Sequence, residues 1–301
     1  MLHPTLAIWL DAARPKTLPL AVTSILSGSA VAATQGSLSW SISVMALITA
    51  LFLQILSNLA NDYGDAIKGT DNMTRLGPMR AIQSGKVSLT TMRRALIFNV
   101  ALTVLSGGGL IAIACQQPTD IISFLLLGLM AIVASITYTV GNKPYGYRGL
   151  GDLSVLMFFG WLGVAGTYYL QVGQIDSLVI LPATACGLLA VGVLNINNLR
   201  DIDNDRACGK HTLVVRLGPE RGRQYHVILL AGAIVCYSLF AALTLQAWLG
   251  WLFLASVPLL VRHGREVYQT ANATALRPMM GSMVRCALVT NGLFMTGMLL
   301  V

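Results

Sequence analysis

Two short segments of the sequence combine asparagine with closely spaced aspartates. The first segment, residues 58–71, reads NLANDYGDAIKGTD, and the second, residues 197–210, reads NNLRDIDNDRACGK. In both segments an asparagine is followed by one aspartate four positions later and by another three or four positions after that. The matched residues are Asn58, Asp62 and Asp65 in the first segment and Asn197, Asp201 and Asp205 in the second. Because residues at i, i+3 and i+4 share a helical face, each segment can direct all three side chains to one point.

Clusters of carboxylates without nearby histidine or cysteine favour a hard cation. Mg²⁺ takes one or two carboxylates and completes its octahedron with water and phosphate oxygens. The sequence therefore predicts Asp62, Asp65, Asp201 and Asp205 as ligands of magnesium, together with a phosphorylated substrate. Asp203 lies off the shared helical face and is left out of this set.

Basic residues are interleaved with these aspartates. A diphosphate leaving group requires both metal and cations, because ionisation of an allylic C–O bond places negative charge on the departing oxygens. The allylic cation left behind needs an apolar, aromatic chamber. Basic residues of the two segments and the loops that follow them are Lys68, Arg75, Arg80, Lys86, Arg200, Arg206, Lys210 and Arg216. Candidates for the aromatic wall are Tyr63, Tyr138, Tyr145, Tyr147, Trp161, Tyr168 and Tyr169.

The elements that position these residues are expected to be membrane helices. The chain is 55% hydrophobic and only 11% charged, too apolar to cover a soluble globule of 301 residues. Several runs of about 20 residues carry few charges, which matches the length of a spanning helix. Alternation typical of barrel strands does not recur, so the fold class is all-α, a single domain over 1–301. The nine expected spans lie near 17–33, 40–59, 95–115, 121–140, 153–172, 178–197, 227–245, 248–261 and 283–301.

The distribution of charge fixes an expected topology. With a cytoplasmic N-terminus and nine spans, the lysines and arginines fall before the first span, in every second loop or at adjacent helix ends. This positive-inside pattern predicts that the N-terminus is cytoplasmic and the C-terminus is outside. The net charge of +8 is therefore mainly a topology signal, and nucleic acid is not expected as a partner. The long loops after the second and sixth spans lie on the cytoplasmic face in this topology, and the site is expected on that face.

The sequence resembles the UbiA superfamily of intramembrane aromatic prenyltransferases over essentially its whole length. Its two Asp-rich motifs match NDYGD (61–65) and DIDND (201–205). Within the superfamily, the likeness is closest to members that prenylate 1,4-dihydroxy-2-naphthoate in menaquinone synthesis. Further matching segments are ARPKTLP (13–19), RLGPMRAIQSG (75–85), YTVGNKPYGYRGLGD (138–152) and NNLRDIDNDRACGKHTLVVRLG (197–218).

This resemblance implies a nine-helix bundle with a cytoplasmic cap formed by the loops after the second and sixth helices. It also implies magnesium-dependent transfer of a polyprenyl chain from polyprenyl diphosphate to the naphthoate, with release of CO₂ and diphosphate. It implies a protein of the bacterial inner membrane, where the prenyl tail of the substrate can lie in the lipid bilayer. Asp71, in the GTD sequence of the naphthoate subgroup, joins the metal ligands. The resemblance assigns diphosphate contacts to Asn58, Lys68, Arg80, Asn197 and Lys210. For the ring of the acceptor, Arg14, Tyr138 and Arg148 are the candidates, with Lys16 as an alternative for its carboxylate.

Two alternatives stay open from the sequence. Prenylation of 4-hydroxybenzoate or a haem precursor would use the same scaffold. An ion-coupled secondary transporter also has acidic residues and repeated halves, but its acids would lie near the midplane, whereas here they lie at the ends of spans. Neither the prenyl length nor the oligomeric state is specified by the sequence.

Overall fold

A computed structural model describes residues 4–245 and 247–301, and in these ranges the chain is helical, with no β-strand. This agrees with the all-α prediction. The helices are α1 (Pro4–Ala13), α2 (Leu18–Ala33), α3 (Trp40–Ile67), α4 (Leu89–Ala114), α5 (Pro118–Thr137), η1 (Tyr145–Arg148), α6 (Gly151–Val155), η2 (Leu156–Gly166), α7 (Thr167–Val172), η3 (Ser177–Val179), α8 (Ile180–Arg200), α9 (Ile202–Ala207), α10 (Leu213–Leu217), α11 (Pro219–Thr244), η4 (Trp248–Ser256), α12 (Val257–Gln269), η5 (Ala273–Leu276) and α13 (Arg277–Leu299).

Local sequence explains where several helices begin. Proline occupies one of the first two positions of α2, α5, α11, α12 and α13, where its missing N–H leaves no helical hydrogen bond unmade. The Ser88 hydroxyl accepts a hydrogen bond from the Thr91 backbone N–H at 3.1 Å and so caps α4. These local signals mark the helix starts in the sequence.

Seven helical segments in the described part of the chain are long and apolar enough to cross a membrane. The count becomes eight if α1 and α2, which meet at a bend of 56°, act as one broken span. Helices also occupy the other expected ranges, but 248–261 belongs to η4 and α12, which do not meet the same test of length and composition. The all-helical, multi-span character is therefore established, whereas the number nine remains a prediction.

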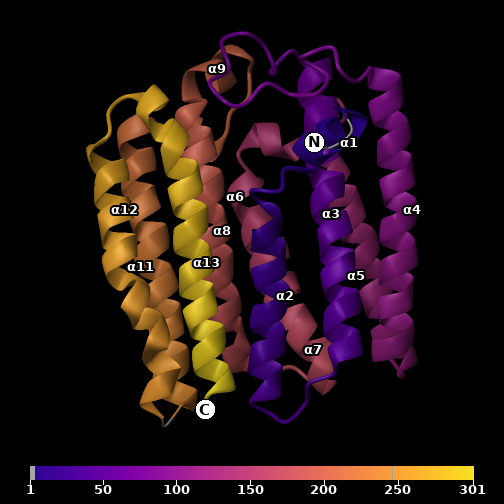
Figure 1. Ribbon diagram of the computed structural model, residues 1–301, viewed down its shortest axis with the longest axis vertical. Helices are drawn as coiled ribbons and strands as arrows, with labels where there is room; N and C mark the ends of the chain where they lie inside the picture. Colours follow the sequence, from indigo (N-terminus) through magenta and orange to yellow (C-terminus); the bar gives the residue numbers. More distant parts are fainter. Residues whose placement is uncertain (1–3, 246) are drawn as a thin grey trace.

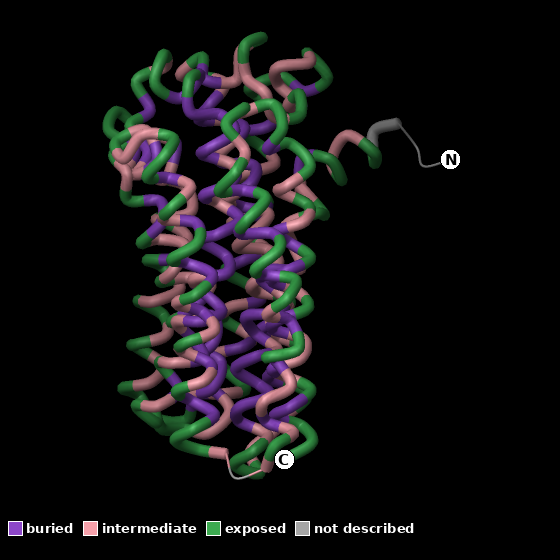
Figure 2. Tube along the Cα trace, turned by 90° about the vertical axis from the view of Figure 1, so that its left-hand side faces the viewer, coloured by how far each residue is buried: buried purple, intermediate pink, exposed green. Residues whose placement is uncertain are grey.

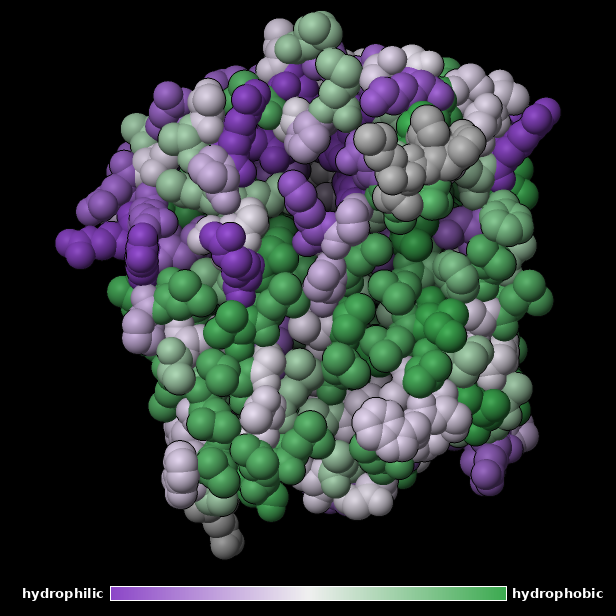
Figure 3. All heavy atoms as spheres, viewed as in Figure 1, coloured by the Kyte–Doolittle hydropathy of each residue, from purple (hydrophilic) through white to green (hydrophobic). Residues whose placement is uncertain are grey.

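The long helices stand side by side as a bundle (Figure 1). The segments 68–88 and 201–218 lie at one end of it, with α9, and this end is called here the loop end. The C-terminus lies at the opposite end, and α1 leaves the bundle sideways near the loop end (Figure 2). Hydrophilic residues gather at the loop end, while the side of the bundle below it is largely hydrophobic (Figure 3). This division is the pattern expected of a bundle embedded in lipid with one wet end.

The two sides of the bundle are packed differently. On one side α8 packs against α11, α13 and η2 around a dense core that includes Leu189, Tyr237, Phe253 and Phe294. Gly160 of η2 and Gly187 of α8 face each other across this contact, and an added Cβ on either would collide with the other helix. Small residues of this kind let membrane helices approach closely. On the other side, α2, α3, α4, α5 and η2 surround a cavity.

The first motif was expected on a helix that runs out of the membrane, with the long loop starting near residue 60. The structure agrees with the helix and corrects the start of the loop, because α3 continues to Ile67. Asp62 and Asp65 therefore lie on the last turns of a 28-residue helix, and the first loop begins only at Lys68. The last turn is closed by hydrogen bonds from the Lys68 N–H to the Gly64 carbonyl, at 3.1 Å, and from the Thr70 N–H to the Asp65 carbonyl, at 3.0 Å.

Candidate functional site

The first motif is held in place by a close helix contact. Thr139, just after α5, donates a hydrogen bond from its hydroxyl to the Ala60 carbonyl at 2.9 Å. A Cβ on Gly64 would lie 2.7 Å from the Thr139 backbone carbonyl carbon, so only glycine permits this approach. The glycine between the two aspartates thus fixes how α3 meets the end of α5.

Cations from distant parts of the chain surround the two carboxylates of the first motif. Asp62 is paired with Arg14, from the turn between α1 and α2, and Arg80 Nε lies 3.5 Å from the same Oδ1. Asp65 accepts a hydrogen bond from the Tyr147 hydroxyl at 2.7 Å and lies 3.7 Å from Lys210 Nζ. The first motif is therefore neutralised entirely by residues outside its own helix.

Arg14 has an unusual backbone. Its φ of 56° makes it the one non-glycine residue with positive φ in the described ranges. Its guanidinium reaches Asp62 and the Asn58 carbonyl, while the Asn58 amide donates back to the Ala13 carbonyl at 2.9 Å. The strained turn between α1 and α2 is thus bound to the first motif both through the Arg14 side chain and through the Ala13 carbonyl.

The second motif is organised at a break between two helices. α8 ends at Arg200, Asp201 forms the junction, and α9 begins at Ile202. Arg200 donates to both carboxylate oxygens of Asp201, at 2.9 and 2.6 Å, and to the Asn197 side-chain oxygen at 2.8 Å. Such bidentate pairing fixes the orientation of a carboxylate.

Each of the two loops places a basic residue beside a carboxylate of the other motif. Arg75, from the loop after the first motif, lies 3.7 Å from Asp201 of the second. Lys210, from the second segment, lies 3.7 Å from Asp65 of the first and 3.8 Å from Asp205. Asn204 donates to the Thr70 carbonyl at 3.0 Å and ties the loops directly. The motifs, 139 residues apart in sequence, therefore form one site.

Several carboxylate oxygens in this site have no hydrogen-bond partner although they are buried. They are Asp62 Oδ2, Asp205 Oδ2 and both oxygens of Asp71, whose nearest cation is Arg75 at 3.3 Å. Within the described residues no three acidic, histidine or cysteine side chains converge tightly enough to hold a metal by themselves. Unpaired buried oxygens of this kind are costly unless a cation meets them, and they fit a metal that takes few protein ligands.

Burial shifts the pKa of groups around the site. It raises the pKa of Asp71 to about 6, although Arg75 opposes the shift, and it raises the pKa of Asp205 to about 6 against the effect of Lys210. Burial, reinforced by Arg14, lowers the pKa of Arg80 to about 9. The Lys210 pKa is raised because Asp65 and Asp205 outweigh burial. At Asp71 and Asp205, the effect of burial on the pKa thus outweighs that of the nearby protein cations.

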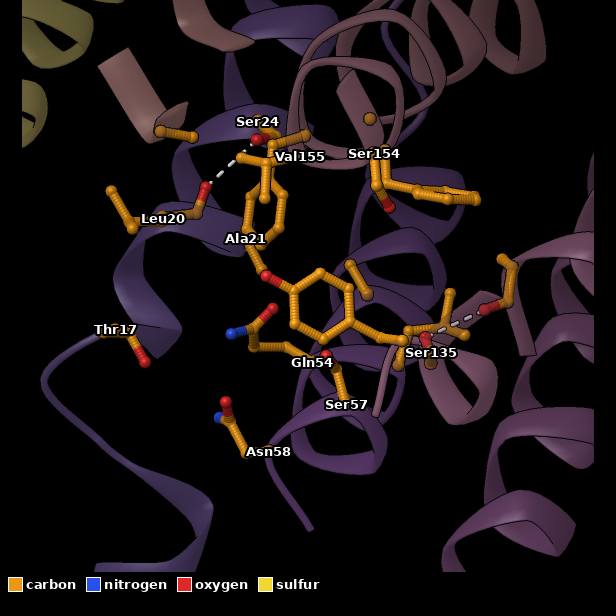
Figure 4. Close-up of a pocket in the computed structure, with 18 of the residues that line it drawn as sticks. Thr17, Leu20, Ala21, Ser24, Gln54, Ser57, Asn58, Ser135, Ser154 and Val155 are labelled. Atoms are coloured by element: carbon orange, nitrogen blue, oxygen red, sulfur yellow. Dashed lines mark hydrogen bonds between the residues drawn. The ribbon is translucent and has the colours of Figure 1, made fainter. Parts of the chain in front are cut away.

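A cavity of about 340 Å³ opens beneath these groups. Its upper lining at the loop end is polar and includes Arg14, Arg75, Arg80 and Lys210 with both motifs. Further from the loop end the lining is apolar. Figure 4 shows Leu20 and Ala21 of α2, Ser57 of α3 and Ser154 of α6 bordering the same space.

The predicted residues fall into three groups in the structure. Those lining the cavity are Arg14, Asn58, Asp65, Arg80, Tyr138, Asn197, Asp201, Asp205 and Lys210. Asp62 and Asp71 are buried behind the arginines of the site. Lys68 lies over the Tyr147 ring, 5.6 Å from its centroid, and Arg148 is exposed, its carbonyl accepting from Arg216. The structure thus gathers most of the predicted set and leaves Arg148 outside.

Sequence reasoning gave some residues too little weight. Arg75 and Arg200 stood among the interleaved cations without a specific role, yet they hold Asp201. Asn61 and Asn198 line the cavity and were not singled out. The available signal was the run of asparagines beside each motif, since polar residues at the end of a membrane span are costly without a partner.

A sequence profile of the UbiA prenyltransferase family matches residues 21–284. The 1,4-dihydroxy-2-naphthoate octaprenyltransferase of Escherichia coli is 55% identical over 97% of this chain and 95% of that protein. The protein of the same name from Haemophilus influenzae is 51% identical over 100% of this chain and 98% of its own length.

Solved structures share the fold. A UbiA homolog from Aeropyrum pernix superposes with a TM-score of 0.69 at 16% identity, covering 92% of this chain and 97% of that one. A UbiA homolog from Archaeoglobus fulgidus, solved with GPP and Mg²⁺, gives a TM-score of 0.57 at 16% identity, with 95% of this chain and 99% of that one covered.

Proposed function

The chain belongs to the UbiA prenyltransferase family, and we propose that it transfers a polyprenyl chain from polyprenyl diphosphate to 1,4-dihydroxy-2-naphthoate. The products are a prenylated naphthoquinol (demethylmenaquinol, the reduced form of demethylmenaquinone), diphosphate and CO₂. Relatives that bear this activity in their names match nearly the full length of the chain. The observation in the structure that carries the proposal is the convergence of two carboxylate motifs and four cations at the polar mouth of an apolar cavity.

The metal is proposed to be Mg²⁺, held by Asp62 and Asp65 on one side and Asp201 and Asp205 on the other, with Asp71 in support. The unpaired oxygens of Asp62, Asp71 and Asp205 support this assignment. Few protein ligands converge, as expected where diphosphate oxygens and water complete the octahedron. When bound, magnesium would neutralise charge on the departing diphosphate.

The protein's own cations would bind the diphosphate. Arg75, Arg80 and Lys210 line the mouth of the cavity, and each is paired only loosely with a carboxylate, at 3.3 to 3.8 Å. A diphosphate can therefore draw them into shorter hydrogen bonds as the allylic C–O bond breaks and charge develops on its oxygens. Asn58 and Asn197 border the same mouth, and Lys68 is proposed as an outer contact at its edge.

The acceptor ring is proposed to lie between Arg14 and Tyr138. Both line the cavity, whereas Lys16 does not. The Arg14 guanidinium would hold the ring carboxylate, so that an electron-rich ring carbon faces the allylic cation. Loss of CO₂ then restores aromaticity. Arg148, which is exposed and does not line the cavity, is given no part in this arrangement.

The proposed setting is the bacterial inner membrane, with nine spans, a cytoplasmic N-terminus and an external C-terminus. The hydrophilic loop end (Figure 3) and the positive-inside pattern support this orientation. The segments 68–88 and 201–218 would then form the cytoplasmic cap.

The test is an assay of the purified protein with octaprenyl diphosphate, offering 1,4-dihydroxy-2-naphthoate and 4-hydroxybenzoate in separate reactions. Transfer to the naphthoate is expected, with loss of the activity in EDTA and its return with Mg²⁺. Transfer to 4-hydroxybenzoate alone would refute the proposed acceptor, and full activity in EDTA would refute the metal.

A further inference from the structure

The cavity extends far from the two motifs. On α3 its lining runs from Asp65 at the loop end to Ala46, a separation of 19 positions. At the rise of an α-helix this corresponds to a depth of about 28 Å, close to the thickness of the hydrocarbon core of a bilayer, about 30 Å. The cavity therefore reaches through most of the membrane.

The cavity is also long for its volume. A volume of about 340 Å³ would suit one compact drug-sized ligand, but here it is distributed along the length of several helices. A space of this shape fits a single extended chain. An isoprenoid tail attached to a diphosphate at the loop end would occupy it lengthwise.

Its deepest part lies between α4 and α5. Apolar side chains of three helices border it: Leu110 and Ile111 of α4, Phe124 of α5 and Leu170 of α7. Gly107 of α4 and Gly128 of α5 line the same space. Gly107 is 18 positions beyond the start of α4 at Leu89, about 27 Å along the helix axis.

These two glycines leave space that a side chain would fill. A Cβ added at Gly107 would meet only the Thr49 methyl, at an ordinary 3.7 Å, and one added at Gly128 would have no neighbour within 4 Å. No helix contact therefore requires glycine at either position. Because both face the cavity, a longer side chain there would extend into the path of a tail.

From this placement we propose that Gly107 and Gly128 set how much of the prenyl tail the cavity accepts. The inference rests on the proposed function, since the ligand is the tail of the prenyl donor. Units of the tail near the diphosphate lie above these glycines, and units further from it pass between them. A bulky residue at either position excludes long donors and leaves short donors unaffected.

The experiment compares Gly107→Leu with Gly108→Leu. Gly108 is the next residue of the same helix, is exposed, has no neighbour within 4 Å of an added Cβ and does not line the cavity. The donors are geranyl and octaprenyl diphosphate, with kcat/KM measured for each. Gly107→Leu should lower kcat/KM for the octaprenyl donor at least about tenfold, as expected from excluding several buried methylenes. It should leave geranyl transfer within about twofold, and Gly108→Leu should change neither.

Equal losses for both donors, or no loss for the octaprenyl donor, would overturn the inference. Gly128→Leu provides a second variant with the same expected pattern on another helix. Should wild-type protein transfer no prenyl group, the proposed function fails, but the inference is still tested by binding. The measurement is then the rise in Tm on adding non-reactive geranyl or octaprenyl thiolodiphosphate. In Gly107→Leu the rise caused by the octaprenyl compound should be lost and that caused by the geranyl compound kept. An unchanged rise with the octaprenyl compound would refute the inference.

Discussion

The two Asp-rich motifs have matching spacing but are held by different means. Asp62 and Asp65 lie on an unbroken helix. They are paired with cations from three other parts of the chain, and Asp65 also accepts a hydrogen bond from Tyr147. Asp201 lies at a helix break and is held chiefly by its own neighbour, Arg200. The same spacing thus produces a motif that depends on tertiary contacts and one that is largely organised locally.

The asparagines differ in the same way. Asn58 fastens the turn before α2 by donating to the Ala13 carbonyl, whereas Asn197 accepts from Arg200 three residues later in its own helix. The motifs are nevertheless interdependent, since Arg75 and Lys210 each approach a carboxylate of the opposite motif. Matched spacing therefore predicts which residues meet, but not which residue stabilises which.

The largest expected effect is loss of one aspartate from either motif. Asp62→Ala and Asp201→Ala should each lower prenyl transfer about a thousandfold, because both remove charge that balances metal and diphosphate. Turnover in isolated membranes with labelled donor measures the effect. Asp203→Ala is the matched control, since its side chain is 86% exposed and pairs only with Arg206 at 3.9 Å. Near-normal turnover in only one of the two variants would show that the motifs are not equivalent.

Removing the local partner of the second motif should reduce stability. Arg200→Met leaves Asp201 buried with only Arg75 nearby, and breaking a buried pair costs about 3 kcal/mol or more. The Tm in detergent should fall clearly, whereas Arg206→Met at an exposed pair should leave it unchanged. Combining Arg200→Met with Asp201→Asn should restore most of the Tm without restoring activity. A Tm that stays low in the double variant would contradict the local role of Arg200.

The ion pairs that link the two motifs can be broken by replacing Lys210. Lys210→Met removes the partner shared by Asp65 and Asp205, so transfer should fall about thirtyfold with a rise in KM for the prenyl diphosphate. Lys143→Met is the control, because Lys143 is an exposed lysine in the α5–η1 connection. An effect on the KM of the acceptor alone would argue against a role in diphosphate binding.

The smallest effect is expected at Tyr147. Its hydroxyl donates to Asp65 at 2.7 Å and lies 2.6 Å from the Thr70 hydroxyl. Tyr147→Phe keeps the ring beneath Lys68 and Lys210 but removes one hydrogen bond to a charged group, worth about 1.5 kcal/mol. Transfer should fall about tenfold, measured as for the aspartate variants. A loss as large as that of Asp62→Ala would instead give the hydroxyl a direct part in the reaction.

The fold was predictable from the sequence to the extent that the bilayer dictates it. Apolar runs of about 20 residues can cross lipid only as helices, because each backbone group must be bonded within its own segment. The ranges of the helices were therefore close, and proline marks several starts. The end of α3 was placed too early because its polar residues resemble a loop, whereas a tertiary contact at Gly64 keeps them in a helix.

The candidate site was predictable in its carboxylates but not in their partners. Asp62, Asp65, Asp201 and Asp205 stand out because acids at the ends of apolar spans are expensive. Their cations could not be assigned, since positive-inside topology places lysine and arginine at the same end for another reason. Only the three-dimensional structure shows that Arg14, Arg75 and Lys210 pair with carboxylates of the site as well as contributing to the topology signal.

The sequence by itself determined the helical membrane fold and which side chains of each motif share a helical face, because hydrophobic length and helical spacing are local properties of the chain. Tertiary structure alone decided that each of the two loops places a basic residue beside a carboxylate of the other motif. It also decided that Arg148 lies outside the site and that a long cavity runs from Asp65 to the glycines of α4 and α5. These features depend on how helices remote in sequence pack against one another, and apolar residues of many kinds satisfy the same lipid environment without specifying that packing.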